Sequence, residues 1–353
     1  MPALIYYCLK FLNPSYFLVS AFIISAITSV ATGTAGGSAS TAGIALISIS
    51  NQLGVAPGMA AGAIIAGAVF GDKMSPLSDT TNLAALVTKV NIFAHIKSMM
   101  WTTIPASIIG MIVWFFAGLH SKGHTNPKQI QTLLHELDKV YNINLIVWIP
   151  LVVIAVCLFL RVSTVPSMLI SSLSALIVGT FNNHFNIVDG LKAMFEGFNH
   201  SMVNQSHLSK NVTTLIEQGG MMSMTEIIVT IFCGYAFAGI VEKAGCLDVM
   251  LNTVSKCVKS VGTLILITVV CSLMLVFAAG VASIVIIMVG VLMKEMFEKM
   301  DLSRSVLSRT LEDSSTMILP LIPWGTSGIY YSHQLNVSVG DFFIWTVPCT
   351  CVH

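Results

Sequence analysis

One short segment of this chain combines charged, hydroxyl and helix-breaking residues in a way that could bind a small cation. The segment GDKMSPLSDTTNLA, residues 71–84, contains Asp72, Lys73 and Asp79, and it follows the stretch Phe11–Gly71, which has no Asp, Glu, Lys or Arg. A charged side chain near the centre of a bilayer costs on the order of 3 kcal/mol and is found mainly where it pairs or lines a pathway. We therefore expect the chemistry of the protein to reside in this segment.

The ligand atoms that this segment offers are nearly all oxygens. Its proline removes a backbone donor, so the preceding helix is predicted to end near Gly71 and to leave carbonyl groups without partners in the helix. Oxygen ligands select hard cations, and the absence of Cys and His from the segment argues against a transition metal. Sodium or a proton fits its few carboxylates best. The oxygen-bearing side chains are Asp72, Ser75, Ser78, Asp79, Thr80, Thr81 and Asn82.

A second segment near the C-terminus has a similar character. RTLEDSSTMILPLIPWGTSG, residues 309–328, places two carboxylates before a hydroxyl cluster and then carries two prolines and two glycines. A small-residue break precedes each segment, TGTAGG in one half and AAGVAS in the other. Paired interrupted segments indicate a transporter site at the interface of two repeats. The side chains concerned are Glu312, Asp313, Ser314, Ser315 and Thr316.

The composition is that of a membrane protein. The chain has 353 residues, of which 55% are apolar and only 9% are charged, whereas a soluble domain has roughly 25% charged residues. The net charge of +1 gives no support to nucleic-acid binding. The eight cysteines lack zinc-type spacing and are interpreted as packing residues. We predict no cofactor.

The uncharged runs are long enough for several membrane crossings. A hydrocarbon core of about 30 Å needs about 20 helical residues, so the first run must be divided, and its Gly- and hydroxyl-rich stretch at 32–41 divides it. We predict an all-α, polytopic membrane fold with two inverted repeats, discontinuous or re-entrant helices and roughly eight to ten membrane-inserted segments. The predicted regions are a first repeat at 1–120 with a broken helix at 71–82, a polar loop at 121–142, spans at 143–182, a polar loop at 183–222, and a second repeat at 223–353 with a broken helix at 312–328.

The same segments resemble a known family. ATGTAGGSASTAGIALISI, GVAPGMAAGAIIAGAVFGDKMSPLSDTTNLA, HIKSMMWTTIPA and LSRTLEDSSTMILPLIPWGTSG are similar to the NhaC family of Na+/H+ antiporters, within a wider ion-transporter superfamily. The resemblance covers nearly the whole chain, which we expect to be a fragment lacking the first spans and the C-terminal end of the family. It implies a multi-pass protein of the bacterial inner membrane that exchanges Na+ for H+, with the lipid bilayer as a partner and homo-oligomerisation left open.

The resemblance also implies which residues form the ion site. It extends that site to the hydroxyl groups of Thr32 and Thr34 in the first break. The other residues that it implies as ion or proton ligands are Asp72, Ser78, Asp79, Thr80, Thr81 and Asn82 in the first half, and Glu312, Asp313, Ser314, Ser315 and Thr316 in the second.

Antiport follows if a buried carboxylate can hold either a sodium ion or a proton. Burial disfavours the charged form of a carboxyl group, so neutralisation by either ion would permit the change between inward-facing and outward-facing states. We expect Asp79 and Asp313 to be the direct Na+ ligands or proton carriers. Lys73 is predicted to neutralise a carboxylate of the opposite repeat, because adjacent residues on a helix point apart. His95 is interpreted as structural or interfacial.

Two other functions remain open. The same scaffold could exchange an organic anion such as malate or lactate, or an amino acid, in which case Lys73 is the best candidate to bind the carboxylate of the substrate. More remotely, GTSG at 325–328 matches a pattern of intramembrane serine proteases, with Ser327 as nucleophile and His333 as base. A four-residue pattern is weak, so we expect a transporter and not an enzyme.

Overall fold

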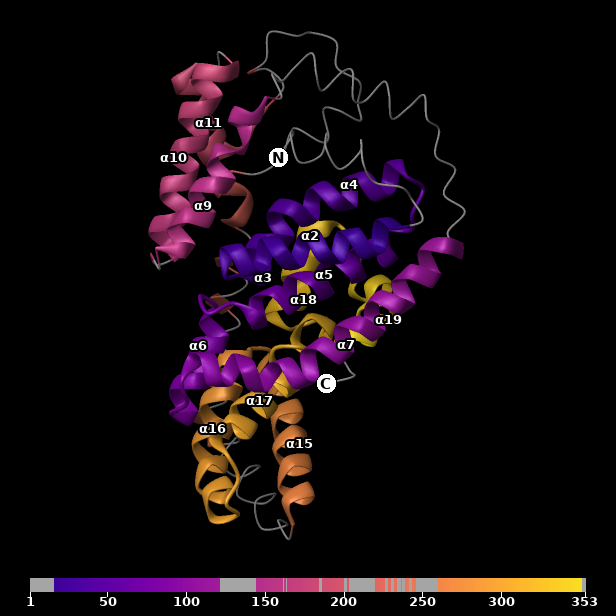
Figure 1. The fold of residues 1–353 in the computed structure, drawn as a ribbon, viewed down its shortest axis with the longest axis vertical. Helices are drawn as coiled ribbons and strands as arrows, with labels where there is room; N and C mark the ends of the chain where they lie inside the picture. Colours follow the sequence, from indigo (N-terminus) through magenta and orange to yellow (C-terminus); the bar gives the residue numbers. More distant parts are fainter. Residues whose placement is uncertain are drawn as a thin grey trace.

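The computed structural model contains helices and no strands in the residues that it describes, as predicted (Figure 1). It describes residues 16–120, 144–160, 162, 164–183, 186–199, 202, 220–225, 260–350 and isolated positions between 228 and 245. The predicted polar loop at 121–142 therefore lies outside the described residues.

The first half of the chain contains a series of helices separated by short breaks. The bounds are α2 (Phe17–Thr32), α3 (Ala35–Ser38), the π-helix η2 (Ala39–Gly43), α4 (Ile44–Gln52), α5 (Pro57–Met74), α6 (Asp79–Thr88) and α7 (Ile92–His120).

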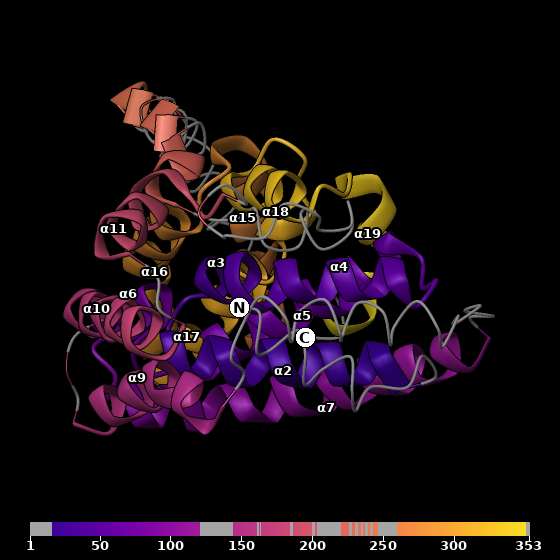
Figure 2. The ribbon, with the colours of Figure 1, turned by 90° about the horizontal axis from the view of Figure 1, so that it is seen from above.

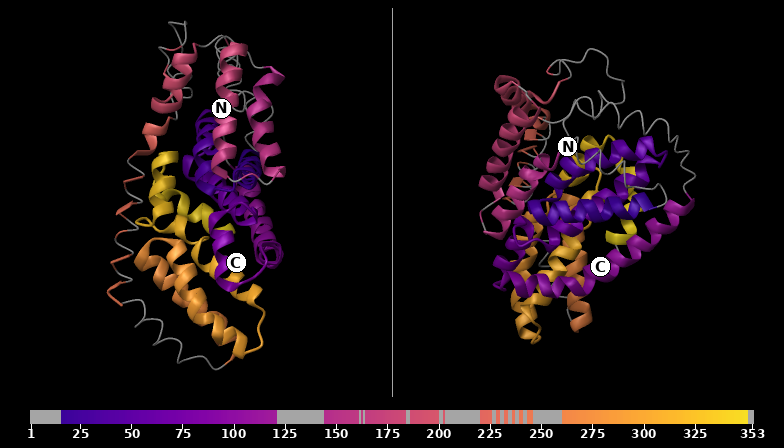
Figure 3. Two further views of the ribbon diagram at one scale, coloured as in Figure 1. Left: turned by 90° about the vertical axis from the view of Figure 1, so that its left-hand side faces the viewer. Right: turned by 45° about the horizontal axis from the view of Figure 1, so that its top comes forward.

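The remaining described helices form two groups, which lie at opposite ends of the molecule (Figure 3). The first group is η3 (Leu145–Trp148), α9 (Ile149–Phe159), α10 (Thr164–Asn183) and α11 (Ile187–Glu196), followed by η5 (Met221–Met224). The second group begins with α15 (Val261–Ala279), α16 (Ala282–Lys299) and α17 (Arg304–Ser315), and from it the chain returns to the centre through η6 (Leu319–Leu321), α18 (Thr326–Leu335) and α19 (Val339–Thr350).

The two halves share the same helix breaks at a constant spacing. Gly33 (φ 68°, ψ 19°) and Gly280 (φ 69°, ψ 14°) are both left-handed, and each is followed by an extended residue that begins the next helix. Lys89 and Asn336, which end α6 and α18, are also left-handed. The same 247 positions separate Gly33 from Gly280, Lys89 from Asn336, and the first residues of α5, α6 and α7 from those of α17, α18 and α19.

The halves also pack on one another reciprocally. Helix α5 contacts α19 while its counterpart α17 contacts α7, and α6 contacts α16 while α18 contacts α3, η2 and α4. Figure 2 shows α18 directly beside α3 and α4. The contacts between the two halves thus form a reciprocal exchange. It brings the end of α17 from the second half against α6 and α7 of the first.

The described surface carries large apolar side chains, and the interior contains several buried charged groups. Helices α7 and α15 are the two described helices that are long and apolar enough to cross a membrane. Their outer faces expose large apolar side chains, such as Trp101, which is 78% exposed. In contrast, Asp72, Lys73 and Glu312 are buried. An apolar exterior around buried charge suits a lipid environment, where charged groups face the protein interior.

The helix break after α5 lies later in the chain than the sequence predicts. Helix α5 was predicted to end near Gly71 but continues to Met74. The reason is steric, since a proline disfavours the helical conformation of the residue before it, and Ser75, which precedes Pro76, is extended (φ −85°, ψ 128°).

The two acidic segments, which are similar in composition, do not occupy corresponding positions in the structure. Asp79 begins α6 after its break, whereas Asp313 lies in α17 before its break. At the common spacing, the counterpart of Asp79 is Thr326. The two acidic segments therefore come from different places in the repeated pattern.

Candidate ion-binding site

An ion pair between Lys73 and Asp313 joins the two halves of the chain. The last turn of α5 carries Lys73, which has no exposed side-chain surface, and α17 carries Asp313, which is 11% exposed. The pairing of Lys73 with a carboxylate of the second half is the one expected from the sequence. Because each charge compensates the other, Asp313 is not available as an unpaired cation ligand in this conformation.

Glu312 lies beside this pair and is fully buried. Its Oε1 accepts hydrogen bonds from Thr80 Oγ1 at 3.0 Å and from Thr81 Oγ1 at 3.4 Å. The first turn of α6 presents both threonines, because the Ser78 hydroxyl caps that helix by accepting from the Thr81 N–H. The break between α5 and α6 thus places the hydroxyl groups of Thr80 and Thr81 against the carboxylate of Glu312 in the opposite half.

His95 completes the environment of Glu312, although it was interpreted as structural or interfacial from the sequence. Its Nε2 lies 3.3 Å from Glu312 Oε2, and its Nδ1 lies 2.8 Å from Ser308 Oγ. The imidazole is fully buried. The available signal was its position in the first turn of α7, shortly before the long uncharged part of that helix.

Asp72 differs from Glu312 and Asp313 in having no Lys, Arg or His side chain as a recorded partner among the described residues. It is 6% exposed, and its Oδ1 has no hydrogen-bond partner among the described residues. The Ser78 side chain and the Ala35 backbone N–H lie next to it, and it interacts electrostatically with Asp79 and Glu312. The N-terminus of α3 and the break after α5 therefore meet at one buried, uncompensated carboxylate.

Comparison with known proteins assigns the chain to a family. The chain matches the Na+/H+ antiporter family over residues 67–353. The chain belongs to this family. It is 34% identical to an uncharacterized Na+/H+ antiporter of Haemophilus influenzae over 99% of this chain and 75% of the relative. It is 31% identical to the Na+/H+ antiporter NhaC of Alkalihalophilus pseudofirmus (99% and 75%) and 33% identical to a malate-2H+/Na+-lactate antiporter of Bacillus subtilis (98% and 73%). The resemblance to NhaC is thus confirmed.

Two predicted ligands, both close to the break between α5 and α6, lie outside the cluster formed by Asp72, Lys73, Glu312 and Asp313. Asp79 is exposed, and its Oδ1 accepts from the backbone N–H of Thr80 at 2.9 Å. Asn82 is also exposed, and its Nδ2 donates to the Pro76 and Ser78 carbonyl oxygens at 2.8 and 2.7 Å. Both residues stabilise the turn that connects α5 to α6.

Most of the remaining predicted hydroxyl ligands bond to nearby backbone. Ser314 and Ser315 each donate to a carbonyl one turn earlier in α17, at 2.6 Å. Thr34 caps α3 by accepting from the Gly37 N–H at 3.2 Å, and Thr32 Oγ1 lies 3.3 Å from the Thr34 carbonyl oxygen. Thr316 Oγ1 is buried with no partner among the described residues.

The geometry of the GTSG segment gives no support to the protease alternative. Ser327 and His333 lie on the same helix, α18. They are six positions apart, which is about 9 Å along the helix axis, so a direct hydrogen bond between nucleophile and base is out of reach.

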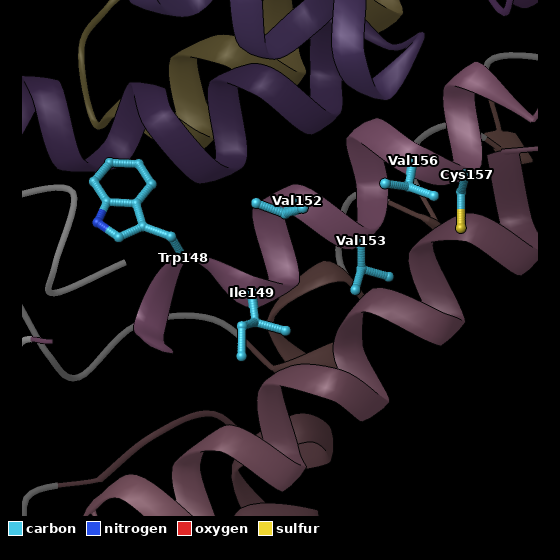
Figure 4. Close-up of a pocket in the computed structure, with 6 residues that line it drawn as sticks. All are labelled: Trp148, Ile149, Val152, Val153, Val156 and Cys157. Carbon is cyan, nitrogen blue, oxygen red and sulfur yellow. The ribbon is translucent and has the colours of Figure 1, made fainter. Parts of the chain in front are cut away.

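One apolar pocket lies away from the cluster, along α9 (Figure 4). Its lining offers no carboxylate or hydroxyl group, so the hard-cation chemistry of the family has no ligands there. The lining residues are Trp148, Ile149, Val152, Val153, Val156 and Cys157.

Proposed function

We propose that this chain exchanges Na+ for H+ across the membrane by alternating access, with Asp72 as the Na+ ligand. The observation that supports this proposal is the buried Asp72 Oδ1, which has no partner among the described residues. The other buried carboxylates are already engaged, Asp313 by Lys73 and Glu312 by His95 and two threonines. The family to which the chain belongs transports these two ions.

The charge of the cluster explains why the two ions would compete. The described cluster has three carboxylates, on Asp72, Glu312 and Asp313, and one ammonium group, on Lys73. An uncompensated buried charge is costly, so the cluster favours the uptake of a positive charge. Sodium at Asp72 supplies one, and so does a proton bound elsewhere in the cluster. Because Asp72 and Glu312 interact electrostatically, binding of a positive ion at one of them weakens binding of a positive ion at the other.

The fold offers a means of exposing the site alternately to each side. We propose that the matching halves are repeats of inverted topology, within the predicted regions 1–120 and 223–353, in a bacterial inner membrane. Their constant spacing of 247 positions and their reciprocal packing support this proposal. Rocking of one repeat against the other would act on α5, α6 and α17, because these helices meet at the interface between the halves.

Exchange of an organic anion is less well supported by the geometry. One relative is named a malate-2H+/Na+-lactate antiporter, so this alternative must be tested. Lys73, the best candidate to bind the carboxylate of such a substrate, is fully buried and paired with Asp313. The structure therefore favours Na+/H+ exchange.

The decisive experiment uses the purified protein in liposomes that contain a pH-sensitive dye. A Na+ pulse should change the lumenal pH, and the Asp72→Asn variant should abolish that change. Asp301→Asn is the matched control, because Asp301 is an exposed acid in the turn between α16 and α17. A normal response from Asp72→Asn would refute the assignment of Asp72, and proton movement driven by malate or lactate but not by Na+ would refute the proposed function.

A further inference from the structure

We propose that the α6–α7 and α16–α17 turns, with the helix ends beside them, form one basic surface that contacts the anionic lipid headgroups of the cytoplasmic leaflet. This contact fixes the orientation of the protein in the membrane. The inference rests on the inverted repeats of the proposed function, and it assigns a side of the membrane to each end of those repeats. The basic surface comprises Lys89, Lys97, Lys294, Lys299, Arg304 and Arg309.

The basic surface contains nearly all the basic side chains of the two matching halves. Within residues 16–120 and 260–350, the one other Lys or Arg is Lys73, which is buried in the candidate ion site. Contacts between α7 and α17 hold the surface together. Ser98 Oγ donates to the Ser305 carbonyl oxygen at 3.1 Å, and Arg309 donates to the Ser98 carbonyl oxygen at 3.4 Å. The side chains that are exposed to the surroundings are those of Lys89, Lys97, Lys299 and Arg304.

Acidic side chains offset only part of this charge. The α16–α17 end carries three of them, against six basic ones in the whole surface. Arg304 forms an exposed ion pair with one of the three, Glu298, at 2.8 Å. Acidic residues also contribute little to the orientation of membrane proteins, which follows the Lys and Arg residues. The basic excess is therefore the charge that bears on orientation. The three acidic side chains are Glu295, Glu298 and Asp301.

The corresponding turn of the first half has the same local structure. Asp301 and Gly54, which are 247 positions apart, are both left-handed, with φ of 55° and 68°. Three backbone hydrogen bonds of the α16–α17 turn recur in the α4–α5 turn at that spacing. They join residues 300 to 296, 301 to 298 and 302 to 297 in one turn, and residues 53 to 49, 54 to 51 and 55 to 50 in the other.

The corresponding positions carry no basic residue, although the backbone is the same. Repeats of inverted topology place corresponding turns on opposite sides of the membrane. The difference in charge between the two turns is therefore a difference between the two sides of the membrane. Figure 1 shows α16 and α4 on opposite sides of the centre of the molecule. The counterparts of the six basic residues, in chain order, are Asn336, Ile344, Ile47, Gln52, Pro57 and Gly62.

The physical chemistry of the bilayer assigns the basic surface to the cytoplasm. Lys and Arg close to the ends of membrane spans concentrate on the cytoplasmic side, and the anionic lipids of that leaflet attract them. Helix α7 is long and apolar enough to cross a membrane. Its one Lys or Arg is Lys97, near its first residue, and no Asp, Glu, Lys or Arg follows as far as His120. The charged end of this span is thus the end at the basic surface.

The orientation is tested on the full chain in bacterial membranes, with a short epitope tag inserted into one turn at a time. One variant carries the tag after Asp301 and the matched variant carries it after Gly54, since both positions are exposed in turns of the same structure. We expect an antibody to bind the tag after Asp301 in inside-out vesicles only. The tag after Gly54 should be accessible in right-side-out vesicles only.

The lipid contact is tested on the purified full chain in neutral detergent micelles. The probe is fluorescent phosphatidylglycerol, with fluorescent phosphatidylcholine as the uncharged comparison. Lys97→Gln/Lys299→Gln should weaken phosphatidylglycerol binding by about fivefold for each charge removed, and should leave phosphatidylcholine binding unchanged. Lys192→Gln is the control, because Lys192 is an exposed lysine on α11, outside the basic surface.

Each part of the inference has a result that would overturn it. A tag after Asp301 on the outer side, with the tag after Gly54 on the inner side, would overturn the orientation and leave the inverted repeats intact. Both tags on one side would overturn the inverted repeats themselves. Equal binding of the two lipids by the wild type, or unchanged binding in the double variant, would overturn the lipid contact. Absence of Na+/H+ exchange in the untagged wild type would overturn the proposed transport and leave the orientation result standing.

Discussion

The ion pair between Lys73 and Asp313 provides the sharpest test of how the two halves are held together. Removing one partner of a buried ion pair costs about 3–5 kcal/mol, because the remaining charge stays buried and uncompensated. Lys73 has no exposed side-chain surface, whereas Asp313 is 11% exposed. We therefore expect Asp313→Asn, which strands the lysine, to cost about 5 kcal/mol, and Lys73→Met, which strands the better-hydrated aspartate, to cost about 3 kcal/mol.

The double variant should be much less damaging than the two single changes together. Replacement of both charged partners leaves no stranded charge, and such replacements are often neutral. We expect Lys73→Met/Asp313→Asn to cost no more than about 2 kcal/mol, far below the sum of the single effects. The assay is unfolding of each purified variant in mixed micelles, with the free energy of unfolding taken from the transition.

This reasoning would be refuted if the loss in free energy of unfolding of the double variant equalled the sum of the losses of the two single variants. Such additivity would show that the two side chains do not interact energetically, and that the halves are joined by other contacts. A double variant that unfolds like the worse of the two single variants would also contradict the proposed neutrality of the pair. Arg304→Gln is a suitable control, because its ion pair with Glu298 is exposed and should contribute less than about 1 kcal/mol.

Further predictions concern the other parts of the site. Gly71→Val should strongly reduce the yield of folded protein, measured by size-exclusion chromatography, because a Cβ at Gly71 would overlap the Ala26 carbonyl oxygen. The control Gly262→Ala should be tolerated, because a Cβ there meets nothing within 4 Å. Equal yields of the two variants would refute the tight packing of α2 on α5. Asp79→Asn should retain most Na+/H+ exchange in the liposome assay, since Asp79 is exposed; complete loss would return it to the set of essential ligands.

Several properties of this protein can be predicted from its sequence alone. Long uncharged runs predict membrane helices, because charge is costly in lipid. Pro76 and the glycines predict interrupted helices through local backbone sterics, which neighbouring residues determine. The concentration of oxygen-bearing side chains at these interruptions predicts hard-cation chemistry. Even the partner of Lys73 was expected in the opposite half, because adjacent helical residues cannot face one another.

The tertiary structure decided which of the candidate groups meet. Lys73 and Asp313 are 240 positions apart in the chain, and His95 is 217 positions from Glu312. No local pattern encodes such contacts, because they depend on how α17 packs against α5, α6 and α7. That packing compensates Asp313, surrounds Glu312 with donors and leaves Asp72 without a Lys, Arg or His partner among the described residues. The residue types reveal the chemistry that is possible, whereas the reactivity of each group follows from its neighbours in space.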